Sequence, residues 1–189
     1  AAVLTSMNGG SNVLWDRKNG FINKALVSPI SRHSLVFGYI GAISIISVLQ
    51  SGIVVGIAFV IGIHFENILM VLPIMITVLL LSFGFSSISI ILAFILKSYD
   101  VFWGIINLLS MVLFMFSTAL FPQELLPNWM ALITQFNPIT YAVMLIRDMM
   151  SDTIENTLIF VNLGIVVIFS ALSIVMARQI FYRESQKPI

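Results

Sequence analysis

Two long runs without a charged side chain, Leu35–Ile63 and Ile68–Leu96, constrain the fold of this chain more than any other feature. Each run has 29 residues, whereas a helix crosses a bilayer with roughly 20 residues at about 1.5 Å each. Two further uncharged runs, Val101–Leu120 and Leu158–Ala177, have 20 residues each. The sequence therefore predicts an all-α, polytopic integral membrane protein with four spanning helices. The two longer helices must tilt, kink or project beyond the hydrocarbon.

The composition excludes burial in a soluble core as an explanation for these runs. The chain is 59% hydrophobic and 9% charged, whereas soluble domains are about 45–50% apolar and about 25% charged. We expect residues 1–189 to form a single transmembrane domain. The absence of cysteine excludes disulfides, thiolate metal sites and a cysteine nucleophile. Because the chain opens on Ala1-Ala2 without methionine or a basic leader, residues 1–10 are predicted to end an earlier span, with N-terminal spans missing.

The basic residues are distributed unevenly among the links that join the runs. Cytoplasmic links carry the excess of Lys and Arg, so segment 11–32, link 97–100 and tail 178–189 are predicted to face the cytoplasm of a multi-pass plasma-membrane protein. Five of the eight acidic residues, and Arg147 alone among the nine basic ones, would then lie outside. The basic residues on the cytoplasmic side are Arg17, Lys18, Lys24, Arg32, Lys97, Arg178, Arg183 and Lys187.

Segment 121–148 is apolar but is interrupted by prolines. If it crossed the membrane, the last run would reverse and place the basic tail outside, against the charge distribution. We therefore predict two short re-entrant helices, Pro127–Phe136 and Pro138–Asp148, that enter and leave by the outer face. The alternative is a pair of amphipathic helices that lie on the outer leaflet, anchored by Trp129 and Tyr141.

The segment before the first long run contains a short amphipathic pattern. Asn19-Gly20 interrupts the chain, and Pro29 ends any helix near Ser28. One reading is an interfacial helix that rests on anionic lipid, and the other is a docking helix for a soluble partner. The apolar face between the two breaks consists of Phe21, Ile22, Ala25 and Leu26.

The two segments together resemble the permease subunit of ABC exporters, in the type-2 family that includes drug and polysaccharide exporters. The first set of matching residues is Asp16-Arg17, Gly20, Leu26, Ser28-Pro29 and Ser31-Arg32. The second set is Pro122, Leu126-Pro127-Asn128-Trp129, Asn137-Pro138-Ile139-Thr140-Tyr141 and Arg147. The sequence departs from the family at Lys18 and Asn23, where glutamates are frequent, and it has four spans where the family has six.

The resemblance implies outward transport of a drug-like, lipid or glycan substrate, driven by a separate ABC-type ATPase subunit. It also implies a second permease subunit, identical or different, and no nucleic-acid partner. The residues that would couple to the ATPase are Asp16, Arg17, Gly20, Phe21, Ile22, Leu26, Ser28 and Pro29. Those that would form an external gate are Pro122, Pro127, Trp129, Asn137, Pro138, Tyr141 and Arg147.

Absent motifs agree with a transport subunit that has no catalytic site, cofactor or metal of its own. The sequence contains no G-x-x-x-x-G-K-[ST], so it has no P-loop for ATP. The four runs contain no Asp, Glu, Lys, Arg or His for ion coupling. His33 and His64 are predicted at opposite membrane faces and cannot share a metal. The main alternative is a non-transporting membrane scaffold, and a channel is a weaker third reading.

A few polar and small residues interrupt the predicted spans. Ser82, Ser86 and Ser89 form one stripe, and Asn107 is the single amide well inside the third run. Gly52 and Gly56 have the G-x-x-x-G spacing of close helix contacts. These residues either pack helices together, or Ser82, Ser86 and Asn107 line a translocation path.

Overall fold

The computed structural model describes residues 1–22, 24, 32–62, 70–96, 98–120, 126–150 and 156–184. Leu26, Ser28, Pro29 and Pro122, four of the predicted site residues, lie outside the described residues. The described regular structure is helical, in agreement with the predicted all-α class. The helices are α1 (Ala2–Asn8), α2 (Gly10–Lys18), α4 (Arg32–Val60), α5 (Val71–Ile95), α6 (Tyr99–Met115), α7 (Asn128–Thr134), α8 (Pro138–Met150) and α9 (Asn156–Glu184).

Three of these helices are long and apolar enough to cross a membrane, within α4, α5 and α9. Helix α6 is apolar but has only 17 residues. Helices α7 and α8 form the predicted short pair, and their axes are bent by 89°. The chain is therefore a polytopic helical membrane protein.

The run Val101–Leu120 is helical only as far as Met115. The hydroxyl of Ser117 donates to the Phe114 carbonyl at 2.8 Å and accepts from the backbone N–H of Ala119 at 3.3 Å. Serine side chains that bond the local backbone in this way compete with helical hydrogen bonds. The last part of the run is therefore a turn, although its composition is as apolar as the helix before it.

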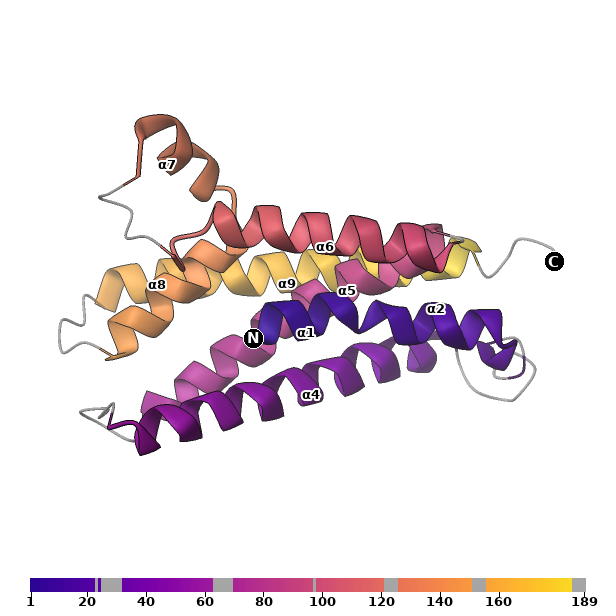
Figure 1. The fold of residues 1–189 in the computed structure, drawn as a ribbon, viewed down its shortest axis with the longest axis horizontal. Coiled ribbons are helices and arrows are strands. Elements are labelled where there is room, and N and C mark those ends of the chain that lie inside the picture. The colour runs from indigo at the N-terminus through magenta and orange to yellow at the C-terminus, as the bar shows by residue number, and fades with distance from the viewer. Residues whose placement is uncertain are drawn as a thin grey trace.

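Helical structure continues past residue 10, where the end of an earlier span is predicted. Gly9, between α1 and α2, keeps helical dihedrals (φ −60°, ψ −26°), so the two helices follow one another almost without a break to Lys18. Met7, Val13 and Leu14 are buried in the core, which holds the extra turns in place. In Figure 1, α1 and α2 run between α4 and α6.

Helix α5 is the centre of the bundle and packs against α1, α2, α4, α8 and α9. Hydroxyl groups join the helices at this centre, as expected where lipid gives no hydrophobic drive for helices to associate. The backbone N–H of Gly10 donates to Ser89 Oγ at 2.9 Å, and Ser170 Oγ donates to the Leu80 carbonyl at 2.6 Å. Ser6 and Ser47 form a further buried pair at 2.9 Å.

The bundle has two chemically different ends. The end of α2, the start of α4, the end of α5, the start of α6 and the end of α9 gather at one end, whereas α7 and α8 lie at the other (Figure 1). Contacts such as Arg17 with Phe94, Trp15 with Tyr99 and His33 with Tyr182 join these elements. We call this the basic end, because it carries Arg17, Lys18, His33 and Arg183.

Candidate functional site

At the basic end, the side chains of Asp16 and Arg17 turn toward the bundle. The Tyr39 hydroxyl of α4 donates to Asp16 Oδ2 at 2.6 Å. Arg17 Nη1 donates to the Phe94 carbonyl at 2.8 Å, and its guanidinium carbon lies 5.9 Å from the centroid of the Phe94 ring. The Phe94 carbonyl belongs to the last turn of α5, where a cation also complements the helix dipole. Both residues therefore fasten α2 to its neighbours.

The residues after α2 present a different surface. Gly20 has φ +72°, a left-handed conformation that side chains disfavour, and no atom lies within 4 Å of the position of a Cβ. The glycine thus allows a turn. After this turn the side chain of Phe21 lies at the surface, at 54% exposure, whereas that of Ile22 is buried, at 4% exposure. Among the predicted coupling residues that the structure describes, Phe21 is the one with an exposed side chain.

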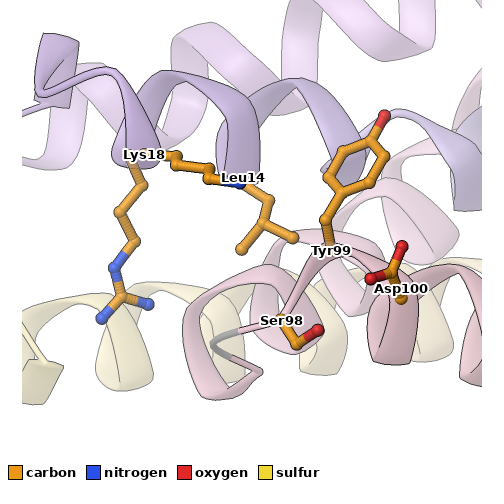
Figure 2. A pocket seen from close by; sticks show the side chains of 6 residues that line it. Leu14, Lys18, Ser98, Tyr99 and Asp100 are labelled. Carbon is orange, nitrogen blue, oxygen red and sulfur yellow. The ribbon is translucent and has the colours of Figure 1, made fainter.

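A cavity of about 520 Å³ lies between α2 and the start of α6. In Figure 2, Leu14 of α2 points toward Ser98 and Tyr99 at the start of α6, and Lys18 and Asp100 also line this space. Trp15 meets the Tyr99 ring edge-on at 6.3 Å between centroids. The α6 residues were not among the predicted site residues, although Asp100 is a second charged residue in the link 97–100. The lining is Leu14, Arg17, Lys18, Ser98, Tyr99 and Asp100.

At the other end, Asn137 joins two helix termini. Its Nδ2 donates to the carbonyls of Leu113 at 2.6 Å and Phe116 at 2.9 Å, at the end of α6. Its Oδ1 accepts from the backbone N–H of Ile139 at 3.0 Å, which caps the start of α8. Pro138 then occupies the first helical position, where its missing N–H costs nothing. Asn137 is 4% exposed, so these hydrogen bonds are shielded from water.

The other predicted gate residues are spread over α7 and α8. Pro127 precedes α7, and its carbonyl accepts from the N–H groups of Met130 and Ala131 at 2.9 Å each. Trp129 is 62% exposed and meets the Phe116 ring edge-on. The Tyr141 hydroxyl donates to the Gln135 carbonyl at 2.6 Å and so closes the bend between α7 and α8. Arg147 lies in the last turn of α8 and is exposed.

The three residues considered as path lining are not brought together. Ser86 is fully buried and lies 3.4 Å from Ser44, as in helix packing. Ser82 is 1% exposed, and its hydroxyl has no hydrogen-bond partner among the described residues. Asn107 lies on the exposed face of α6. The contacts of Ser86 thus agree with the packing reading.

Replacing Ser82 with alanine is therefore expected to leave the melting temperature unchanged or slightly higher, because it removes a buried hydroxyl that lacks a partner. Ser170→Ala is the matched control, since the Ser170 hydroxyl shares its one hydrogen between the Leu80 and Val166 carbonyls. That variant should lose about 1 kcal/mol of stability. Thermal unfolding of the purified protein measures both. A larger loss for Ser82→Ala than for Ser170→Ala would contradict the assignment.

A polar cavity that the sequence analysis missed lies on the N-terminal helices. Its volume is about 310 Å³, and Ile43 and Ile46 of α4 form its apolar wall. The signal was present in the sequence, because Thr5, Asn8 and Asn12 recur at i, i+3 and i+7 of one helix face. The polar wall consists of Thr5, Asn8, Gly9, Ser11 and Asn12.

The described residues contain no group of three or more His, Asp or Glu side chains that could hold a metal ion. The bundle and the bent helix pair define a multi-pass membrane protein, in which the described residues place charged side chains at the basic end and uncharged polar side chains around a cavity on α1 and α2.

The chain belongs to the ABC-2 type transporter family, whose model matches residues 1–151. This confirms the resemblance drawn from the two motif segments. Two relatives carry the name "Putative transport permease ycf38": the protein of Cyanophora paradoxa is 31% identical over 78% of this chain and 51% of its own length. The protein of Porphyra purpurea is 30% identical over the same shares. The chain thus spans about half the length of these relatives. No solved structure matches it.

Proposed function

We propose that the chain is a membrane-spanning part of an ABC exporter permease, which moves its substrate outward with ATP hydrolysed by a separate subunit. The family match carries this proposal, since it covers both the segment after α2 and the helix pair α7–α8. The excess of basic residues supports a cytoplasmic position for the basic end. A second permease subunit would complete the pathway, at the plasma membrane.

The contacts at the basic end support a coupling role for α2 and the segment that follows it. Arg17 is bonded to the end of α5, and Phe94 packs edge-on against Phe181 of α9 at 4.9 Å between ring centroids. Asp16 is bonded to α4 through Tyr39. A displacement of α2 would therefore be transmitted to three long helices. In this proposal Asp16 and Arg17 position α2, and Phe21 makes the contact with the ATPase.

The polar cavity supports a location for part of the pathway. It is lined by uncharged hydrogen-bonding side chains on one wall and by Ile43 and Ile46 on the other. A path for amphipathic cargo requires this mixture of a few polar groups and a largely apolar wall. We infer that the second subunit closes this cavity and that Ser82 and Ser86 serve packing.

Phe21→Ser is expected to weaken binding of the proposed ABC-type ATPase partner by at least about tenfold, because exposed aromatic anchors carry much of the energy of interfaces. The exposed position of Phe21 should leave the fold intact. Phe136→Ser is the matched control, since Phe136 is 83% exposed near the opposite end. Pull-down of the ATPase measures binding. Equal binding by both variants would reject the docking role.

A non-transporting scaffold is the alternative, and ATP-dependent transport separates the two readings. A scaffold would bind the ATPase without moving any substrate. Efflux of dyes and lipid analogues from cells that express both subunits should fall when the P-loop lysine of the ATPase is replaced, and should fall equally in the Phe21→Ser variant. If the ATPase binds but efflux is unchanged by the P-loop lysine substitution and by Phe21→Ser, the result would support the scaffold.

A further inference from the structure

A second charged cavity at the basic end involves the first turns of α4 and the last turns of α9. Its volume is about 590 Å³. The rings of His33 and Tyr182 lie nearly parallel, with 6.5 Å between centroids and 12° between planes, and so join the two helices at this cavity. We call it the α4–α9 cavity. Its lining residues are His33, Val175, Arg178, Gln179, Tyr182 and Arg183.

The charged side chains that line the α4–α9 cavity are all basic. Arg178 and Arg183 contribute two guanidinium groups, and His33 adds an imidazole. Among the described residues that line the cavity there is no Asp or Glu. Guanidinium groups match the geometry of phosphate oxygens and bind them through paired hydrogen bonds. The cavity is therefore suited to a phosphate group.

The surface of α9 next to the cavity is apolar and exposed. Val175 lines the cavity, and Leu172 and Ile168 follow it at helical spacing toward the middle of the span, at 60% and 59% exposure. On α4, Phe37 lies one turn beyond His33 and is half exposed. A phosphate site continued by an apolar strip along two membrane helices fits a ligand with both a phosphate and an acyl chain.

We propose that the α4–α9 cavity binds an anionic phospholipid, with its phosphate between Arg178 and Arg183 and its acyl chains along Val175, Leu172 and Ile168. Basic pockets between membrane helices have the chemistry that selects anionic headgroups. Free phosphate and an acidic protein surface would each use only the cationic half. This site lies on other elements than α2 and Phe21, so the proposal is independent of the coupling role.

The test uses the full protein that carries this chain, in nanodiscs or detergent, titrated with phosphatidylglycerol and with phosphatidylcholine and followed by native mass spectrometry. We expect phosphatidylglycerol to be preferred. Arg178→Gln combined with Arg183→Gln should lower this preference about 25-fold, at roughly fivefold for each arginine near a membrane surface. Arg178→Lys combined with Arg183→Lys should retain the part of the preference that depends on charge and lose the part that depends on paired guanidinium hydrogen bonds, so that this variant should lie between the unmodified protein and the paired glutamine variant.

Lys24→Gln is the matched control, because Lys24 is exposed and does not line the cavity. It should change the preference by less than about twofold. The proposal is wrong if the paired glutamine variant keeps its preference, or if Lys24→Gln loses as much as one cavity arginine. It is also wrong if inorganic phosphate or glycerol phosphate displaces the lipid at equal concentration. Loss of ATPase binding with an unchanged lipid preference would assign the cavity to a protein partner instead.

Discussion

Gly10→Ala is expected to destabilise the protein by about 3 kcal/mol, because the added methyl group has no space where α2 crosses α5. A Cβ at this position would lie 2.5 Å from the Ser89 carbonyl oxygen and 2.7 Å from the carbonyl carbon. These are backbone atoms of the central helix, so no rotamer change relieves the contact. Separation of the helices would also break the hydrogen bond from the Gly10 N–H to Ser89 Oγ.

Two other glycines provide matched controls for this prediction. The three atoms nearest to a Cβ at Gly9 all belong to the Ile43 side chain, and because they are side-chain and not backbone atoms, Gly9→Ala should cost less than Gly10→Ala. At Gly104 on α6 nothing lies within 4 Å, and alanine there should be neutral or stabilising by up to about 1 kcal/mol. Thermal unfolding of the three variants should rank them in this order. Equal melting temperatures for Gly10→Ala and Gly104→Ala would show that α2 does not cross α5 so closely.

Asn137→Ala is expected to cost about 4 kcal/mol, because it removes the partners of three backbone groups, one of them buried and two of them part-buried. These groups are the carbonyls of Leu113 and Phe116 and the N–H of Ile139. Asn137→Asp should be no better, because its carboxylate keeps the cap on α8 but would face the two α6 carbonyls. Both helix termini should loosen together in either variant.

Asn128→Ala is the control for the second prediction, since Asn128 is an exposed residue at the start of α7. The melting temperature of the Asn128→Ala variant should remain close to that of the unmodified protein. Hydrogen exchange should increase in both α6 and α8 of Asn137→Ala and in neither helix of the control. Increased exchange confined to α8 would mean that Asn137 acts only as a local cap.

The sequence was sufficient to predict the class of the fold, because in lipid an uncharged run of about 20 residues is a spanning helix almost regardless of its neighbours. The short helices α7 and α8 were also predictable, since Pro127 and Pro138 set where each can begin. The end of α6 at Met115 was missed, because the hydroxyl of Ser117 is a local competitor that hydropathy does not register.

The orientation of individual polar side chains could not be predicted. The motif identifies Asp16 and Arg17 as neighbouring residues of opposite charge, but their partners, Tyr39 and Phe94, are remote in sequence and come close only through packing. The hydroxyl groups of Ser86 and Ser44 likewise come close only because α4 packs against α5. The coupling and gate roles of the motif residues stay predictions, to be decided by the binding and transport measurements.

The side chain of Asn137 also makes the α7–α8 end of the bundle cooperative. Because one amide terminates α6 and initiates α8, neither helix end can rearrange while the other keeps its hydrogen bonds. Intermediate positions would leave buried backbone groups unpaired and would be poorly populated. This region should therefore have two populated states, one with all three hydrogen bonds of Asn137 formed and one with all three broken. A movement of α8 would then be a cooperative transition between these two states.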